Sequence, residues 1–362
     1  MTIAALRITD FRNLAAIDMV PCSPGLNIIH GDNGSGKTSL LEALHYIGMG
    51  RSFRTGSAGR IIRHQADKFT LFAQLIAEAE RQVAVGLEKE HTGAMRLRMA
   101  EKDAVSIMEI AAFLPIRVIN THSHHIFESG PIYRRKFLDW GLFYHSEAFL
   151  PCWRQYERAL KQRNAALRDK RPKREIDVWT DELVKHGLEF HRLREEYVQQ
   201  LAPYIIAAAS ELLPFQDYCI EYLSGWDNSE DFAQSLASDF ATEIRSGCTQ
   251  SGPHRADLDI LLEGIPAKYF LSRGQQKLLV CAMIVAQGML LAAQRNKRVV
   301  YLIDDLPAEL DKQGRDKLMS MLAKQQTQVF ITAIEKEIFC EIANAKLDIP
   351  VKLFHVEHGQ LR

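Results

Sequence analysis

The sequence has no excess of charge of either sign. Its 45 lysine and arginine residues balance 45 aspartate and glutamate residues, so the formal net charge at pH 7 is zero. A field from the whole molecule therefore cannot attract a polyanion such as nucleic acid or an anionic membrane surface. Any site for a polyanion must be a local cluster of basic residues.

Paired cysteines and long apolar runs are also missing. The six cysteines lie far apart and form no C-x-x-C pair, which argues against a zinc site or a disulfide framework. No cleavable apolar leader follows Met1. The most apolar run, 278–293, is interrupted by Gln287 and Gly288 and is shorter than the roughly 20 residues that span a bilayer. We therefore expect a soluble, cytoplasmic protein with no membrane partner.

Hydrophobic patterning divides the 362 residues into three parts. Residues 1–103 combine short strands with a glycine-rich loop and a helix, 104–250 are mainly helical in pattern and rich in charge, and strands return in 251–362. Strands at both ends with helices between them predict an α/β domain assembled from both termini, carrying a mainly helical inserted second lobe.

Residues 31–38, GDNGSGKT, fit the phosphate-binding pattern G-x-x-x-x-G-K-[ST] at every fixed position. The loop follows a predicted strand and opens a predicted helix, whose positive end would face the anion. We expect Lys37 to neutralise the β- and γ-phosphates and Thr38 to offer its hydroxyl to Mg²⁺. The expected nucleotide-binding residues are Gly31, Asp32, Asn33, Gly34, Ser35, Gly36, Lys37 and Thr38.

Two carboxylates end a second apolar segment. Residues 299–303, VVYLI, are typical of a buried parallel strand, and Asp304 and Asp305 follow directly. Ligands of open α/β sheets bind at the carboxyl ends of strands, although two solvated carboxylates in a turn are the alternative. We expect Asp304 to join Thr38 in the Mg²⁺ shell and Asp305 to polarise the attacking water. The expected catalytic residues are Lys37, Asp304 and Asp305.

Residues 271–277, LSRGQQK, precede a long apolar helical run. Ser272 and Gln275 have the S-x-x-Q spacing of a capping box, so an ordinary capped helix is one interpretation. A second anion site is the other, because a serine hydroxyl and Gly274 at a helix N-terminus permit close approach of a phosphate.

Together these segments resemble ABC-type ATPases. Residues 31–38, 271–277 and the strand ending at Asp304 look like the Walker A, signature and Walker B motifs, and 309–311 looks like the D-loop. The opening segment 6–14, LRITDFRNL, resembles the SMC-like branch of that superfamily. Within the branch the chain is similar to the RecF family of bacterial recombination and repair proteins, in segments 128–131, 134–140, 160–164, 249–257 and 354–357.

The resemblance implies an ABC-type P-loop ATPase head that binds ATP and Mg²⁺ and forms an ATP-dependent homodimer. In such ATPases two subunits sandwich two nucleotides, so Ser272, Gly274 and Gln275 would complete the site of a second copy. RecF proteins bind gapped duplexes or single-strand/duplex junctions, cooperate with RecR and RecO, help load RecA and support the SOS response.

Two departures from the superfamily pattern concern hydrolysis. Thr332 stands where ABC transporters carry a histidine, and Asp305 where they usually carry a glutamate. Both changes leave the attacking water less well held, so we expect a weak, DNA-stimulated ATPase that acts as a timer.

A basic run covers residues 154–174, where Glu157 and Asp169 are the only acidic residues. Cations at positions 154, 158 and 161 share one helical face and could contact successive phosphates without reading sequence. A solvated helix end is the alternative. Given the resemblance, we expect Arg154, Arg158, Lys161 and Arg163 to bind DNA, with residues 134–136 as a second candidate.

Among other functions, an SMC-type tether is rejected, because it would need sustained heptads between Thr38 and Ser272 and the sequence has none. An ATPase subunit of another DNA-repair or transport machine fits the motifs, and a small-molecule kinase would leave Ser272 unexplained. His122, His124 and His125 suggest a metal site or a surface loop, and no carboxylate or cysteine accompanies them at ligand spacing.

Overall fold

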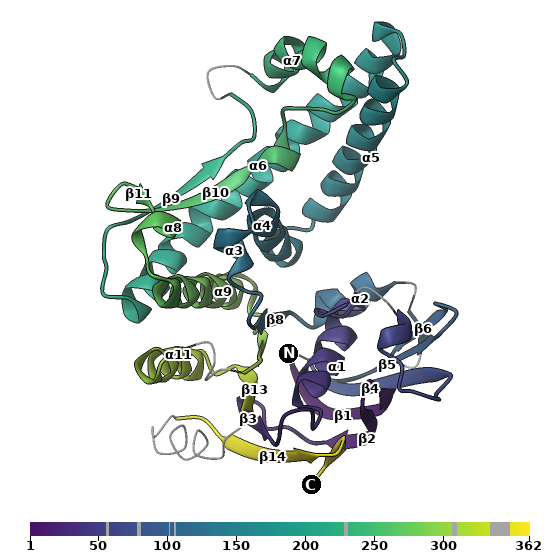
Figure 1. The fold of residues 1–362 in the computed structure, drawn as a ribbon, viewed down its shortest axis with the longest axis vertical. Helices are drawn as coiled ribbons and strands as arrows, with labels where there is room; N and C mark the ends of the chain where they lie inside the picture. The colour runs from purple at the N-terminus through teal and green to yellow at the C-terminus, as the bar shows by residue number, and fades with distance from the viewer. Residues whose placement is uncertain are drawn as a thin grey trace. The chain divides into compact units, whose positions relative to one another are not determined.

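A computed structural model describes residues 1–55, 58–77, 81–100, 102–104, 106–227, 231–305, 310–333 and 348–362. Contacts divide the chain into two compact units (Figure 1). The first comprises Met1–Ser123 and Lys277–Arg362, and the second His124–Gln276. The first unit is an α/β domain built from both ends of the chain, and the second is mainly helical, which is the architecture predicted from the sequence.

The boundaries of the inserted unit lie later than the expected 104–250. Strand β8 (Ile116–Ile119) pairs with β12 (Val300–Ile303) and so belongs to the sheet of the first unit. Strand β10 (Asp257–Leu262) pairs with β9 (Tyr218–Leu223) in the second unit, whereas the sequence analysis assigns it to the ATPase lobe. The correction has a simple cause, because an alternating pattern reveals a strand but not the sheet that the strand joins.

One sheet of the first unit is antiparallel, with strand order β2-β1-β4-β5-β6-β7. Its long strands bury every second residue, as in β4 and β5, so one face covers the core and the other meets solvent. The strands are β1 (Thr2–Phe11), β2 (Leu14–Met19), β4 (Lys68–Ile76), β5 (Gln82–Glu90), β6 (Met95–Met99) and β7 (Lys102–Asp103), with a 3-10 turn at Ala58–Arg60.

The other sheet has the order β15-β14-β3-β13-β12-β8 and is parallel from β14 to β8. Strands β3, β13 and β12 are buried along their whole length, which explains their nearly continuous apolar runs. Because these strands are parallel, their carboxyl ends lie at one edge of the sheet. The remaining bounds are β3 (Gly25–His30), β13 (Gln328–Ala333), β14 (Val351–Glu357) and β15 (Gln360–Leu361).

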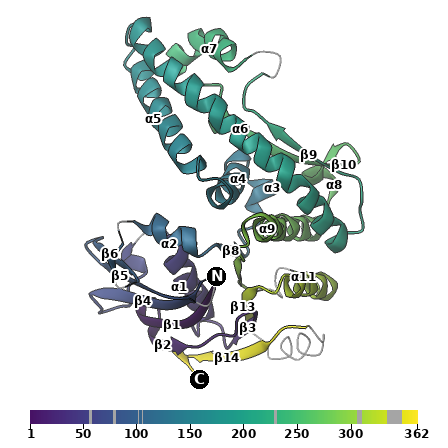
Figure 2. The same ribbon diagram turned by 180° about the vertical axis from the view of Figure 1, so that it is seen from behind.

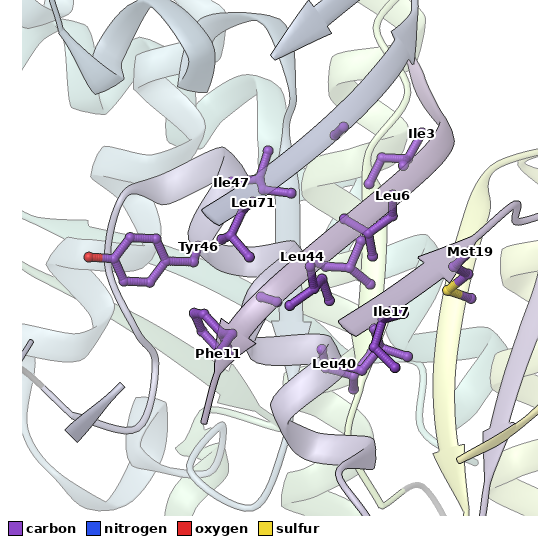
Figure 3. Close-up of a cluster of buried hydrophobic side chains, with 14 of the residues drawn as sticks. Ile3, Leu6, Phe11, Ile17, Met19, Leu40, Leu44, Tyr46, Ile47 and Leu71 are labelled. Carbon is purple, nitrogen blue, oxygen red and sulfur yellow. The ribbon is translucent and has the colours of Figure 1, made fainter. Parts of the chain in front are cut away.

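Helix α1 (Lys37–Met49) lies at the centre of the first unit, and its residues 39–48 are all buried. Figure 3 shows Leu40, Leu44 and Ile47 of α1 among side chains from β1, β2 and β4. Phe11 and Tyr46 meet edge to face with ring centroids 6.1 Å apart, a geometry that adds to the apolar burial. The core therefore fixes the helix that follows the glycine-rich loop. Two further helices of this unit are α2 (Ile107–Phe113) and α11 (Lys312–Lys324).

The second unit is built on a pair of long helices, α5 (Phe149–Arg168) and α6 (Lys173–Leu212), which lie side by side in Figures 1 and 2. Pro172 lies between the two helices, and α6 begins directly after it. The other elements are α3 (His125–Glu128), α4 (Pro131–His145), α7 (Phe232–Ser246), a 3-10 turn at Pro253–Arg255, β11 (Ile265–Pro266) and α8 (Ala267–Phe270).

Helix α9 (Arg273–Arg295) begins in the second unit and continues into the first. It extends beyond the apolar run at both ends, and among the described helices it alone is long and apolar enough to cross a bilayer. However, 67% of its most apolar window is buried inside the structure, as in the core helix of a globular domain.

Candidate nucleotide-binding site

A pocket of about 560 Å³ opens in the first unit at the carboxyl edge of the parallel sheet. Several predicted residues line it together, and they come from the glycine-rich loop and from the end of β12. They are Asn33, Gly34, Gly36, Lys37, Thr38, Asp304 and Asp305. The parallel register brings these distant segments together, because β3 and β12 both pair with β13.

The backbone of the loop favours an anion. Helix α1 begins at Lys37 without a side-chain cap, and its first residues line the pocket, so the pocket lies at the helix end whose N–H groups have no partners within the helix. Gly36 adopts a φ of 122°, and a Cβ there would lie 2.7 Å from Cδ2 of Leu14. Only glycine fits this position.

The side chain of Lys37 folds back onto the start of its own loop. Its Nζ donates to the carbonyl oxygens of Gly31 at 2.7 Å and Asp32 at 2.9 Å. Burial lowers the pKa of Lys37, and the carboxylates of Asp305 and Asp304 oppose that change. Gly31, Asp32 and Ser35 shape the loop but are not among the residues that line the pocket.

Thr38 and Asp304 meet in the pocket, with Oγ1 of Thr38 donating to Oδ1 of Asp304 at 3.0 Å. Thr332, at the end of β13, donates to the same carboxylate oxygen at 2.7 Å and accepts from the backbone N–H of Asp305 at 2.8 Å. Thr332 therefore holds the carboxylate of Asp304 and the backbone of Asp305. In the sequence Thr332 stands out only as a departure from transporters, so its contact with Asp304 was not predicted.

These donors fit Mg²⁺. A threonine hydroxyl and a carboxylate within hydrogen-bond distance are hard oxygen ligands, and Mg²⁺ in nucleotide sites uses one or two such groups together with phosphate oxygens. Asp304 and Thr38 are thus the residues that would hold the ion.

Arginines that the sequence analysis does not assign to the site line the pocket as well: Arg12, Arg54 and Arg60. Arg12 forms a bidentate ion pair with the fully buried Glu42, at 3.0 and 2.6 Å, and Arg54 lies 3.6 Å from the same carboxylate. A buried acid thus holds two guanidiniums beside a site for an anion. For Arg12 the available signal was segment 6–14, which also carries the resemblance to the SMC-like branch.

Ser272 and Gln275 form the predicted capping box at the start of α9. Oε1 of Gln275 accepts from the N–H of Ser272 at 2.9 Å, and Oγ of Ser272 accepts from the N–H of Gln275 at 3.4 Å. Ser272 and Gly274 are exposed. These residues belong to the second unit and are not among those that line the pocket. Of the D-loop segment, Glu309 lies outside the described residues.

The predicted DNA-binding residues of α5 separate into two kinds. Arg154, Arg158 and Lys161 are exposed, as one helical face requires. Arg163 is a correction, because its side chain is 1% exposed and donates to Glu243 at 2.6 Å and Thr249 at 2.8 Å. Position 163 falls on the opposite face of the helix, so this arginine serves the fold.

In the second candidate for DNA binding, residues 134–136, two arginines make contacts within the fold. Arg134 forms a bidentate ion pair with Asp257 at 2.6 and 2.8 Å, and Arg135 donates to the carbonyl of Ala256. Of the histidines, His124 lies 3.4 Å from Glu128, and Nδ1 of His125 lies 2.5 Å from the hydroxyl of Ser129.

The sequence matches a family model described as the RecF/RecN/SMC N terminal domain over residues 2–360. It is 41% identical to the DNA replication and repair protein RecF of Shewanella denitrificans over 361 residues, which cover 100% of this chain and 99% of the relative. The protein of the same name from Cellvibrio japonicus is 40% identical over 362 residues, covering 100% and 99% of the two chains. The chain belongs to the RecF family.

Solved structures agree on the fold of this RecF family member. The recombination mediator protein RecF with ATPrS superimposes with a TM-score of 0.85 at 22% identity, over 99% of this chain and 97% of the other. An Smc head bound to the C-winged helix domain of ScpA gives a TM-score of 0.60 at 14% identity, over 100% and 96%. The predicted ABC-type ATPase head, with its mixed α/β content, is confirmed.

Proposed function

We propose that this RecF family member is an ATP-dependent DNA-binding protein of recombinational repair and replication restart. The observation that carries the proposal is the pocket in which Lys37, Thr38 and Asp304 converge, with the hydroxyl of Thr38 3.0 Å from Asp304. A phosphate-binding loop next to oxygen ligands for Mg²⁺ is what a nucleoside triphosphate requires. The family membership selects ATP among such ligands.

Each residue of the pocket has its own role in ATP binding or hydrolysis. The α1 N-terminus and Lys37 hold the phosphates, while Thr38 and Asp304 hold Mg²⁺, which when bound neutralises developing phosphate charge. Asp305 orients the attacking water and accepts its proton. The short side chain of Asp305, and a threonine at position 332 in place of the transporters' histidine, support slow hydrolysis. We propose in addition that DNA stimulates this weak ATPase.

A second copy of the chain completes the site. We place Ser272, Gly274 and Gln275 of one subunit on the γ-phosphate bound by Lys37 of the other. Their support is the exposed helix start of α9, where the Ser272 hydroxyl and the bare backbone of Gly274 are open to an approaching anion. ATP binding then drives dimerisation, and hydrolysis releases it.

DNA binds to the exposed row of Arg154, Arg158 and Lys161 on α5. These cations contact phosphates and carry no sequence readout, in keeping with a gapped duplex or a single-strand/duplex junction as the target. RecR and RecO are the protein partners, RecA is the indirect one, and the action supports the SOS response in the cytoplasm. RecF relatives named for DNA replication and repair support this assignment.

Fluorescence anisotropy of a labelled gapped duplex tests the proposal, with and without ATP–Mg²⁺. We expect tight binding by the wild type that requires ATP, and its loss in Lys37→Ala and in Ser272→Arg. Ser272→Arg still binds nucleotide, because its own P-loop is intact. DNA binding indifferent to ATP in all three proteins would contradict the proposal. ATP hydrolysis without any DNA binding would instead favour an ATPase subunit of another machine.

A further inference from the structure

We propose that Asn13 and the turn at Gly359 form a brace that holds the P-loop in its phosphate-binding shape, so that the hairpin of β14 and β15 is a working part of the nucleotide site. The inference rests on the proposed ATP binding. It adds two positioning residues to the site, one from the β1–β2 turn and one from near the end of the chain.

Asn13 contacts the loop from one side. Its Nδ2 donates to the carbonyl oxygen of Gly34 at 3.0 Å, and its Oδ1 accepts from the hydroxyl of Ser39 at 2.8 Å. One amide side chain thus joins the middle of the P-loop to the first turn of α1. It also lines the pocket, so it fixes the loop from within the site.

The C-terminal hairpin contacts the loop from another side. The backbone N–H of Gly359 donates to the carbonyl oxygen of Ser35 at 2.9 Å. Strand β14 runs parallel to β3 as far as the pair His30 and His355, and Val356 then lies against Gly31, the first residue of the loop. Figure 2 shows β14 in yellow beside β3. The hairpin therefore touches the P-loop at its start and at its middle.

The two parts of the brace also touch each other. A Cβ at Gly359 would collide with the carbonyl oxygen of Asn13, and the φ of Gly359 is 76°. A side chain at 359 must therefore push apart the β1–β2 turn and the hairpin, between which residues 34–36 are held. The brace donates hydrogen bonds to the carbonyl oxygens of Gly34 and Ser35, so we infer that the N–H groups of the loop face inward. A loop that is held in this shape before the nucleotide arrives binds the phosphates more tightly.

Gly264→Ala provides a matched control for Gly359→Ala. Gly264 has a φ of 77°, almost the same as Gly359, but a Cβ there meets nothing within 4 Å. Both substitutions carry the same backbone strain, and only Gly359→Ala collides with Asn13. The affinity for a fluorescent ATP analogue with Mg²⁺ and the melting temperature without nucleotide are measured for both variants, for Asn13→Ala and for the wild type.

We expect Gly359→Ala and Asn13→Ala each to raise the Kd for the ATP analogue about tenfold, the size of one lost phosphate hydrogen bond. Gly264→Ala should bind as the wild type does, even where its melting temperature falls as far. If Gly359→Ala does not fold, the affinity of Asn13→Ala for the ATP analogue tests the brace, because this substitution only removes side-chain atoms. The brace is contradicted if Asn13→Ala, and Gly359→Ala where it folds, bind the ATP analogue as tightly as the wild type does. It is also contradicted if Gly264→Ala weakens binding as much as they do. A wild type that binds no ATP refutes the proposed function instead.

Discussion

Thr332 donates its hydroxyl to Oδ1 of Asp304 at 2.7 Å, and that oxygen also accepts from Thr38. In Thr332→Val the shape is kept but the hydroxyl is lost, so the carboxylate of Asp304 and the backbone N–H of Asp305 each lose a hydrogen-bond partner. We expect hydrolysis to fall roughly tenfold, about the effect of one lost hydrogen bond to a charged group, with ATP affinity nearly unchanged. Steady-state kcat and a separate equilibrium Kd check this. A parallel Asp304→Asn variant should lose far more, since it removes a ligand of Mg²⁺. Equal kcat in Thr332→Val and wild type would show that Thr332 has no such role.

The row on α5 gives a prediction about salt. Replacing Arg154, Arg158 and Lys161 with alanine should weaken DNA binding and reduce the slope of log K against log salt by about 2 to 3, since each phosphate contact contributes roughly 0.9 on duplex DNA. Binding is titrated over a range of salt concentrations. The control replaces Arg96, Arg98 and Lys102, which are exposed on the antiparallel sheet and carry the same charge. If both triple variants change the slope alike, the effect is net charge and not a DNA contact.

Arg163 should matter for stability. Its guanidinium donates to Thr180, Thr249 and the fully buried Glu243, joining α5, α6 and α7. Arg163→Ala leaves a buried carboxylate without its cation, which costs about 3–5 kcal/mol. Urea denaturation should register this loss, whereas Arg158→Ala on the exposed face should stay within about 0.5 kcal/mol of wild type. If Arg163→Ala unfolds with the same free energy as the wild type, Glu243 finds other partners in the variant.

Acid should destabilise the second unit through His254. Burial lowers the pKa of His254 to about 4, and its ring accepts from the hydroxyl of Tyr156 at Nδ1, 2.7 Å away, while Nε2 faces the carbonyl of Thr249. The unfolded chain, with an ordinary histidine pKa near 6.5, binds more protons between these values. Stability is therefore complete above pH 6.5 and falls as the pH drops toward 4, by about 2 kcal/mol at pH 5. Urea denaturation at pH 7 and pH 5 should show this loss, and His254→Gln should lose less between the two pH values. An identical pH dependence in the variant would assign the effect to other groups, such as His45, whose pKa is also about 4.

Short-range patterns predicted which residues of the first unit meet in its pocket. The P-loop at 31–38 and the aspartates after 303 carry their chemistry in the local sequence, and parallel pairing through β13 brings them to one edge. The capping box at Ser272 was also readable, because it depends on a spacing of three residues.

What the sequence could not give are contacts between distant segments. Arg163 belongs to the same basic run as Arg158, and only the packing of α5 against its neighbours shows that it is buried with Glu243. No local pattern singles out Glu42, yet it is fully buried in α1 and accepts from Arg12 beside the pocket. The pairing of β10 with β9 likewise depends on tertiary structure, which moved the domain boundary.

We propose above that ATP joins two copies of this chain, with each P-loop facing the signature segment 271–277 of the other copy. Sedimentation velocity with ATP–Mg²⁺ tests it most directly, on wild type, Ser272→Arg and Lys37→Ala. We expect the wild type to shift from monomer to dimer with ATP, and Ser272→Arg to bind ATP but stay monomeric. An ATP-dependent dimer of Ser272→Arg, as tight as that of the wild type, would contradict the shared site.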